Sequence, residues 1–159
     1  IREALEKDMK RIHELDMKMN NEMKEFTHRL REPKEVEDEY IKFLRENLTK
    51  DNVMFFVAEE EDRIVGYCSG AIFKPYPSIN KYEKIGFIYD VYVLKEYRGK
   101  EIGKKLMEKL EDWFKLRGMK WVKLWVYRKN KNAIKLWESM GFKKDLIEMN
   151  KKITKNDSE

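Results

Sequence analysis

The sequence predicts an α/β fold, formed by a single domain in which strands and helices alternate. Apolar residues recur with strand spacing in some segments and with helical spacing in others, and the two kinds of segment alternate along the chain. Residues 85–118 contain a strand, a short glycine loop and a helix in direct succession. With 159 residues, 42% of them hydrophobic, the chain can bury one substantial core. We assign residues 1–153 to this domain and residues 154–159 to a polar tail that we expect to be disordered.

The first third of the chain predicts a short strand followed by a helical hairpin. Residues 1–4 are expected to form an edge strand, and Asp8 is the expected start of the first helix. Apolar residues then recur every three or four positions as far as Leu30, and Pro33 ends this helix. A second helix is expected over residues 34–49.

The middle of the chain predicts three strands. Residues 52–60 and 63–73 form a hairpin that turns at Glu61-Asp62. An irregular, proline-containing loop over residues 74–84 leads to the third strand. That strand, residues 85–94, is a nearly continuous apolar run, which is typical of a strand covered on both faces.

The last third continues the alternation. Apolar residues from Ile102 to Leu116 have helical spacing, and Gly118 closes this helix. Residues 121–127 are expected to form a core strand, residues 130–140 a helix and residues 142–153 the closing strands. The predicted order is therefore β-α-α-β-β-β-α-β-α-β-β.

The loop before the helix that begins at Ile102 predicts an anion site. The first turn of a helix presents unpaired N–H groups at the positive end of the helix dipole. Four basic residues surround it: Arg98, Lys100, Lys104 and Lys105. A P-loop is excluded because only three residues separate Gly99 from Gly103 and no Ser or Thr follows Lys104. A Gly-x-Gly-x-x-Gly dinucleotide motif is absent. Phosphate or pyrophosphate is the expected ligand.

Two motifs resemble those of one enzyme superfamily. Residues 98–103, Arg-Gly-Lys-Glu-Ile-Gly, resemble the Arg/Gln-x-x-Gly-x-Gly/Ala pyrophosphate loop of the GNAT N-acetyltransferases, with Glu101 in place of the first glycine. Residues 130–142 resemble the Asn-x-x-Ala-x-x-Leu-Tyr-x-x-x-Gly-Phe segment of the same superfamily, with Trp137 at the tyrosine position. The resemblance implies a mixed, mostly antiparallel central sheet with helices on both faces, and two central strands that splay into a cleft for acetyl-CoA.

The resemblance also implies how acetyl-CoA, the co-substrate, is held, and it implies no metal. Backbone groups of the central strand would bind the pantetheine amides, the basic loop would bind the pyrophosphate, and the 130–142 segment would form the opposite wall. The implied binding residues are Val91, Tyr92, Val93, Arg98, Gly99, Lys100, Glu101, Ile102, Gly103, Lys104, Asn130 and Trp137.

Glu101 departs from the motif. If the glycine of the family has a positive φ, a glutamate there would cost about 1 kcal/mol or more. We therefore expect Glu101 to have ordinary helical angles and an exposed side chain, with Lys105 as its ion-pair partner one turn on.

The implied reaction is direct acetyl transfer to a primary amine. An amine with a pKa of about 10.4 is mostly protonated at neutral pH, so a base or a water chain must remove a proton. Asp90 is the first candidate base, with Tyr89 and Glu83 behind it, although Asp90 could equally be a structural carboxylate. Strand alternation puts Asp90 and Tyr92 on one face and Tyr89 and Val91 on the other, unless a bulge changes the parity.

The leaving thiolate needs a proton. An indole such as that of Trp137 is not a usable acid, so Tyr127 is the candidate donor, with water as the alternative, and Trp137 is expected to pack.

Several properties bound the partners. The 35 basic and 30 acidic residues are interspersed, which disfavours a nucleic-acid partner, although Trp121, Trp125 and Tyr127 alternate with basic residues as in a stacking surface. A single cysteine, Cys68, and the lack of a membrane-length apolar run favour a cytoplasmic protein. His13 and His28 do not have the spacing of metal ligands. The acceptor is expected to be a small-molecule or peptide amine, and a homodimer is left open. The alternative is a non-catalytic CoA-binding or ligand-sensing module of the same fold.

Overall fold

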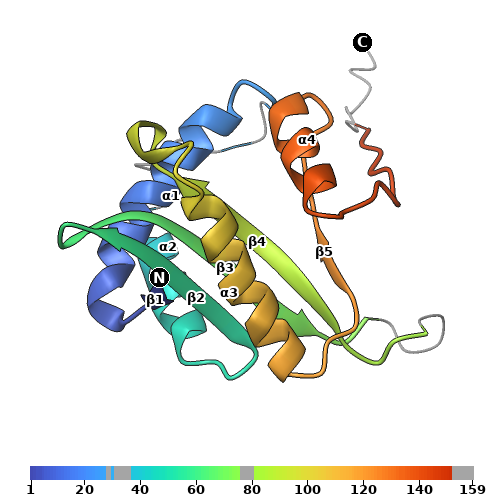
Figure 1. Cartoon of the computed structure of the whole chain (residues 1–159), viewed down its shortest axis with the longest axis horizontal. Helices are drawn as coiled ribbons and strands as arrows, with labels where there is room; N and C mark the ends of the chain where they lie inside the picture. Colours follow the sequence, from blue (N-terminus) through green and yellow to red (C-terminus); the bar gives the residue numbers. More distant parts are fainter. Residues whose placement is uncertain (28–29, 31–36, 76–80, 152–159) are drawn as a thin grey trace, which may run out of the picture. The chain divides into compact units, whose positions relative to one another are not determined.

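The computed structural model describes residues 1–27, 30, 37–75 and 81–151 (Figure 1). The chain divides into two compact units, residues 1–127 and the residues from Arg128 onward, and each is described by itself. The first unit contains the whole sheet and the first three helices, and the second contains the fourth helix.

Within the described residues, five strands form one mixed sheet and pair in the order in which they occur in the chain. They are β1 (Arg2–Glu3), β2 (Val53–Glu60), β3 (Arg63–Phe73), β4 (Ile85–Val93) and β5 (Val122–Leu124). Neighbours are antiparallel except β4 and β5, which are parallel and are joined through a helix. The β2–β3 hairpin turns at Glu61 and Asp62, as predicted. Both residues have positive φ. The predicted mixed, mostly antiparallel sheet is therefore confirmed.

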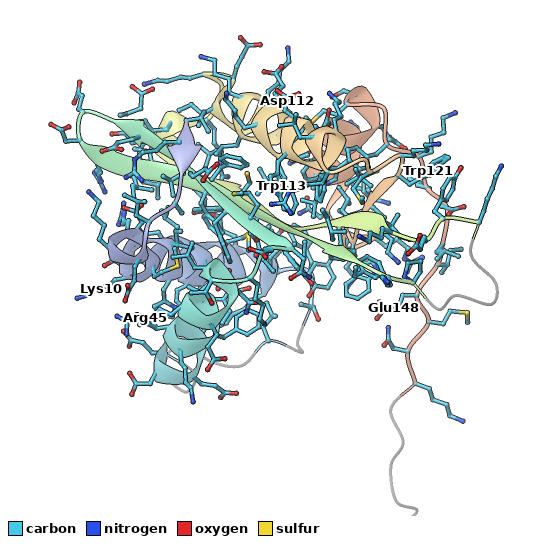
Figure 2. All side chains as sticks on the ribbon, turned by 90° about the horizontal axis from the view of Figure 1, so that it is seen from below. Lys10, Arg45, Asp112, Trp113, Trp121 and Glu148 are labelled. Carbon is cyan, nitrogen blue, oxygen red and sulfur yellow. The ribbon has the colours of Figure 1, made fainter. Side chains whose placement is uncertain are left out.

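Helices cover both faces of this sheet. α1 (Met9–Met23) and α2 (Glu37–Leu48) lie on one face, and α3 (Ile102–Leu116) lies on the other (Figures 1 and 2). Figure 2 shows Trp113 between α3 and the sheet, with Asp112 on the outer side of the helix. A Cβ at Gly86 would come within 2.7 Å of the Phe114 ring, so only glycine lets α3 approach β4 this closely.

The two N-terminal helices differ from the prediction at their bounds. α1 begins after Asp8 as expected but ends at Met23, and the chain then turns, with the Phe26 N–H donating to the Met23 carbonyl at 2.9 Å. Apolar spacing continues to Leu30, but Asn20, Asn21 and Thr27 are weak helix formers, which periodicity alone does not weigh. The predicted helix end at Pro33 and the predicted start of the second helix at residue 34 lie outside the described residues.

The predicted closing strands are wrong for residues 142–151, which contain no strand. The apolar side chains of Leu146, Ile147 and Met149 are almost fully exposed, at 87%, 87% and 89%. The apolar residues in this segment are too few and too irregularly spaced among charged ones to give the alternation of a half-buried strand. Residues 152–153 and the predicted tail lie outside the described residues.

Candidate functional site

The central strands part in the middle of the sheet. β4 and β5 are paired only where Gly86, Phe87 and Ile88 face Val122, Lys123 and Leu124. After Ile88, β4 continues to Val93. One edge of this part of β4 pairs with β3, and the described residues provide no strand that pairs with its other edge. This is the predicted splay, and it explains why β5 is shorter than the predicted strand over residues 121–127. The prediction of a core strand there is also wrong, because Trp121 and Trp125 are 55% and 76% exposed.

A β-bulge lies at the point where the strands part. In the β3–β4 register Ser69 faces Asp90 and Gly70 faces Ile88, so Tyr89 is an extra residue on β4. The bulge changes the strand parity, and the ring of Tyr89 contacts that of Phe87 at a centroid distance of 5.0 Å. The predicted placement of Tyr89 and Asp90 on opposite faces is therefore wrong, since both line the same cavity.

This cavity lies between α2 and the sheet and has a volume of about 300 Å³. The described residues that line it are Tyr40, Phe43, Leu44, Asn47, Val53, Phe55, Ser69, Phe87, Ile88, Tyr89, Asp90 and Trp125. Its walls are mostly aromatic and aliphatic, and Asp90 provides a carboxylate. Such a cavity suits a small ligand with one basic group.

Asp90 is held in an environment that suits a proton acceptor. The Ser69 hydroxyl donates a hydrogen bond to its carboxylate at 3.1 Å. Burial and, to a lesser degree, the negative charge of Asp16 raise the pKa of Asp90 to about 7, against the lowering effect of the Ser69 hydrogen bond. Asp90 therefore changes its charge near neutral pH, where a general base is most effective.

Asp16 on α1 is a second buried acid that the sequence analysis did not single out. Its side chain is 2% exposed and accepts hydrogen bonds from the Tyr67 hydroxyl at 2.9 Å and the Asn20 amide at 2.7 Å. Tyr40 also hydrogen-bonds to it, and burial raises its pKa. A sequence signal exists, since Asp16 lies four residues after the buried Ile12, within the apolar stripe of a helix.

The other candidate acids and bases are less well placed. Tyr89 lines the cavity but is 57% exposed. Glu83 is exposed and forms an ion pair with Lys74 at 3.6 Å. Tyr127 is half-buried, and neither it nor Glu83 is among the described lining residues. The structure thus brings Asp90 and Tyr89 together and leaves Glu83 and Tyr127 apart from them.

Two residues of the basic loop, Gly99 and Glu101, have positive φ. Gly99 has φ of 81°, and Glu101, directly before α3, has φ of 58° and ψ of 10°. The expectation of helical angles at Glu101 is therefore wrong, and Glu101 adopts the left-handed conformation. Its carboxylate is exposed as expected, but its ion-pair partner is Lys104 at 3.7 Å and not Lys105.

The Arg98 side chain anchors this loop to the rest of the protein. Its Nε donates to the Val93 carbonyl at 2.9 Å, and Nη2 donates to the Glu22 carboxylate at 3.0 Å. The Tyr92 hydroxyl donates to the same carboxylate at 2.8 Å. Glu22 on α1, which the sequence analysis missed, thus holds both the loop and the end of β4.

The loop fits an anionic diphosphate. The first turn of α3 provides N–H groups that have no partner within the helix. A Cβ on Gly99 would meet nothing within 4 Å, and one on Gly103 would meet only Val93 Cγ2 at 3.8 Å, so the backbone is open to an approaching ligand.

The second unit holds the remaining predicted site residues. Asn130 precedes α4 (Lys131–Ser139), and its side-chain oxygen accepts a hydrogen bond from the Ala133 N–H at 3.0 Å. Trp137 is half-buried, and its ring packs edge-on against Phe142 at 5.6 Å. Packing of Trp137 is observed, whereas contacts of Asn130 and Trp137 with acetyl-CoA stay predictions.

Neither a metal-ligand cluster nor a membrane-spanning helix is present in the described part of the chain. It contains no group of three or more His, Cys, Asp or Glu side chains placed to hold a metal ion. His13 is buried on α1 and packs against the Tyr40 ring at a centroid distance of 5.7 Å. None of the helices in the described residues has both the length and the apolar character needed to cross a bilayer.

The chain resembles known proteins in both sequence and fold. The pattern of the acetyltransferase (GNAT) family matches residues 3–142. An uncharacterized N-acetyltransferase from Archaeoglobus fulgidus is 36% identical over 107 residues, which cover 66% of this chain and 68% of that protein. A solved structure of a candidate acetyl transferase from Pyrococcus furiosus is 31% identical, with a TM-score of 0.74, and the match covers 91% of this chain and 93% of that one. A predicted acetyltransferase from Clostridium acetobutylicum, solved with acetyl-CoA, shares the fold at 19% identity, with a TM-score of 0.75 and 94% of each chain covered. The chain therefore belongs to the GNAT family of acetyl-CoA-dependent N-acetyltransferases.

Proposed function

We propose that this protein transfers the acetyl group of acetyl-CoA to a primary amine bound in the cavity, and that Asp90 accepts the proton of that amine. One observation carries the proposal. The bulge at Tyr89 places the Asp90 carboxylate in the cavity, at the point where β4 and β5 part. A carboxyl with a pKa of about 7 in that position can take a proton from a bound ammonium at neutral pH.

Two parts of the chain would hold acetyl-CoA, which supplies an acetyl thioester when bound. The backbone from Gly99 to Lys104 would hold the diphosphate, since the glycines leave the first turn of α3 accessible. The open edge of β4, from Val91 to Val93, would bind the pantetheine amides as an additional strand would. The Clostridium acetobutylicum protein of the same fold was solved with acetyl-CoA, which supports acetyl-CoA as the ligand.

The proposed transfer balances as follows. The ammonium of the acceptor gives one proton to Asp90, and the neutral nitrogen then forms a bond to the acetyl carbon as the carbon–sulfur bond breaks. The nitrogen gives up its second proton to water as the acetamide forms, and the departing thiolate takes up one proton, either from water or from a side chain, for which Tyr127 is the proposed donor. The products are an acetamide and the free thiol of CoA.

Replacement of Asp90 tests this function. Asp90→Asn is expected to lower kcat with acetyl-CoA and an amine by roughly 10²-fold or more at neutral pH, because a general base typically contributes that much. The loss should shrink as the pH approaches the pKa of the amine. Glu83→Gln, which neutralises an exposed acid on the segment leading into β4, is the matched control and should retain activity.

Binding measurements separate the outcomes. The Asp90→Asn protein should bind acetyl-CoA with normal affinity in calorimetry. Near-normal turnover of this variant would remove Asp90 from the catalytic role. Tight acetyl-CoA binding by the wild-type chain, with no acetylation of any amine in a broad panel, would favour the non-catalytic module.

A further inference from the structure

The cavity beside Asp90 has an unusually aromatic lining. Six of its described lining side chains carry a ring: Tyr40, Phe43, Phe55, Phe87, Tyr89 and Trp125. Asp90 is the only charged side chain among the described lining residues. The cavity therefore combines one acidic group with walls that are mostly aromatic and aliphatic.

These rings are arranged in groups around the cavity. Phe87 lies in the middle of one group, with Tyr89 at 5.0 Å and the edge-on Trp125 at 4.9 Å between ring centroids. Tyr40 and Phe43 on α2 stack at 5.8 Å and form a second group. Ring pairs at these distances hold one another in place and present flat apolar faces.

Three of the rings are left largely exposed. Phe43 is 52%, Tyr89 57% and Trp125 76% exposed, although all three line the cavity. Large apolar side chains that gather around a hollow and stay exposed are typical of a ligand site, because a ligand can bury their surface.

The following inference rests on the acetyl transfer proposed above. We propose that the acceptor is a small arylalkylamine, that is, a primary amine whose short chain carries an aromatic ring. Its ammonium would lie at Asp90 and its ring among Phe87, Tyr89 and Trp125. A volume of about 300 Å³ is at the small end for ligand sites, which limits the acceptor to a single short chain and a ring.

The same lining disfavours two other classes of amine. The hydroxyls of an amino sugar would lose their hydrogen bonds to water against aromatic walls, which is costly. The second ammonium of a linear diamine would find no second carboxylate among the described lining residues.

A matched set of amines tests the proposal. The purified chain is assayed with 2-phenylethylamine, putrescine and glucosamine by release of the CoA thiol, and binding of each amine is measured separately by calorimetry. The expected result is that 2-phenylethylamine has a kcat/KM and an affinity at least about tenfold above those of the other two, since apolar pockets discriminate by this order.

Two exposed tryptophans provide the variants. Trp125→Ala should lose at least about tenfold in 2-phenylethylamine affinity, whereas Trp125→Phe should recover most of it. Trp121→Ala is the matched control, because Trp121, which directly precedes β5 whereas Trp125 directly follows it, is 55% exposed and is not among the described lining residues. It should bind 2-phenylethylamine normally.

The two readouts distinguish this proposal from the function on which it rests. Selective 2-phenylethylamine binding that depends on Trp125, without acetyl transfer to it, would support the site and contradict the enzymatic function. Acetyl transfer that prefers putrescine or glucosamine, or 2-phenylethylamine binding that Trp125→Ala leaves unchanged, would overturn the proposed acceptor class and leave the function standing.

Discussion

The hydroxyl of Tyr67 on β3 donates a hydrogen bond to the buried Asp16 carboxylate on α1, across 2.9 Å. Two residues further along β3, Ser69 donates to Asp90. Tyr67 and Ser69 thus hold two acids from different elements within one buried polar cluster, which Tyr40, Asn20 and His13 complete. The negative charge of Asp16 raises the pKa of Asp90, because burial leaves little water to screen the two charges.

The first prediction follows from this cluster. Asp16→Asn removes the charge that helps to raise the pKa of Asp90, so the pKa of Asp90 should fall. Asp90 would then lose its proton at a lower pH, and the acid limb of the profile of kcat/KM against pH should move to lower pH. Glu14→Gln neutralises an exposed acid of α1 and should leave the profile in place. An unchanged acid limb in Asp16→Asn would show that the two acids titrate independently.

The second prediction concerns Glu101 in its left-handed conformation. Glu101→Gly should stabilise the fold by about 1 kcal/mol, because glycine adopts positive φ without the steric cost of a side chain. Glu101→Gln removes the charge but keeps the strained backbone, so it should leave the free energy of unfolding in urea nearly unchanged. Equal stability of the two variants would contradict the strain argument.

The same pair of variants also tests the anion site. Both remove a negative charge next to the proposed diphosphate site, and both should therefore bind acetyl-CoA more tightly than the wild type. The measurement is the dissociation constant from calorimetry at low salt. A gain confined to Glu101→Gly would assign the effect to the backbone instead of the charge.

The third prediction uses the open space at Gly103. Gly103→Val should fold, because its Cβ would meet only Val93 Cγ2 at 3.8 Å, but the added side chain should obstruct the approach of the diphosphate. We expect acetyl-CoA affinity to fall by roughly tenfold or more, on the scale of losing hydrogen bonds to a charged group. Lys109→Val places the same β-branched residue at an exposed position of α3 and controls for its low helix propensity. A folded Gly103→Val protein with unchanged affinity would refute the site.

The fourth prediction concerns protonation of the leaving thiolate. Trp137 packs against Phe142, so Trp137→Phe should keep kcat within about tenfold, well short of the loss expected for a general acid. Tyr127→Phe removes a hydroxyl only, and a loss of roughly 10²-fold or more would identify Tyr127 as the donor. An unchanged rate in Tyr127→Phe would point to water. Loss of all activity in Trp137→Phe, with normal acetyl-CoA binding, would contradict the packing role.

Much of the fold could be predicted because its patterns are local. The apolar stripe of α3, the turn at Glu61-Asp62 and the glycine spacing of the basic loop each depend on a few neighbouring residues. The short extent of β5 could not be predicted, because it depends on where β4 stops pairing with it. Val122, Leu124 and Val126 at alternate positions favour a core strand over residues 121–127, yet alternation alone does not say which face is covered.

The site was predicted only as far as its local motif. Asp90 was identified from its place on the central strand, but the bulge that turns both Asp90 and Tyr89 toward the cavity is a property of the β3–β4 register. Asp16 and Glu22 act on residues more than fifty positions away, on β3 and in the basic loop. Such contacts depend on the tertiary arrangement and leave no periodic signal in the sequence.

The raised pKa of Asp90 also affects the stability of the folded protein. In the unfolded chain this carboxyl has its ordinary value of 3.8, whereas in the folded protein it is about 7. Between these two pH values the folded state holds more protons than the unfolded state, so the free energy of unfolding falls as the pH rises through this window. As the pH rises through about 7, Asp90 in the folded protein becomes ionised and able to accept a proton. The conditions that favour turnover are therefore those in which this residue destabilises the native state most.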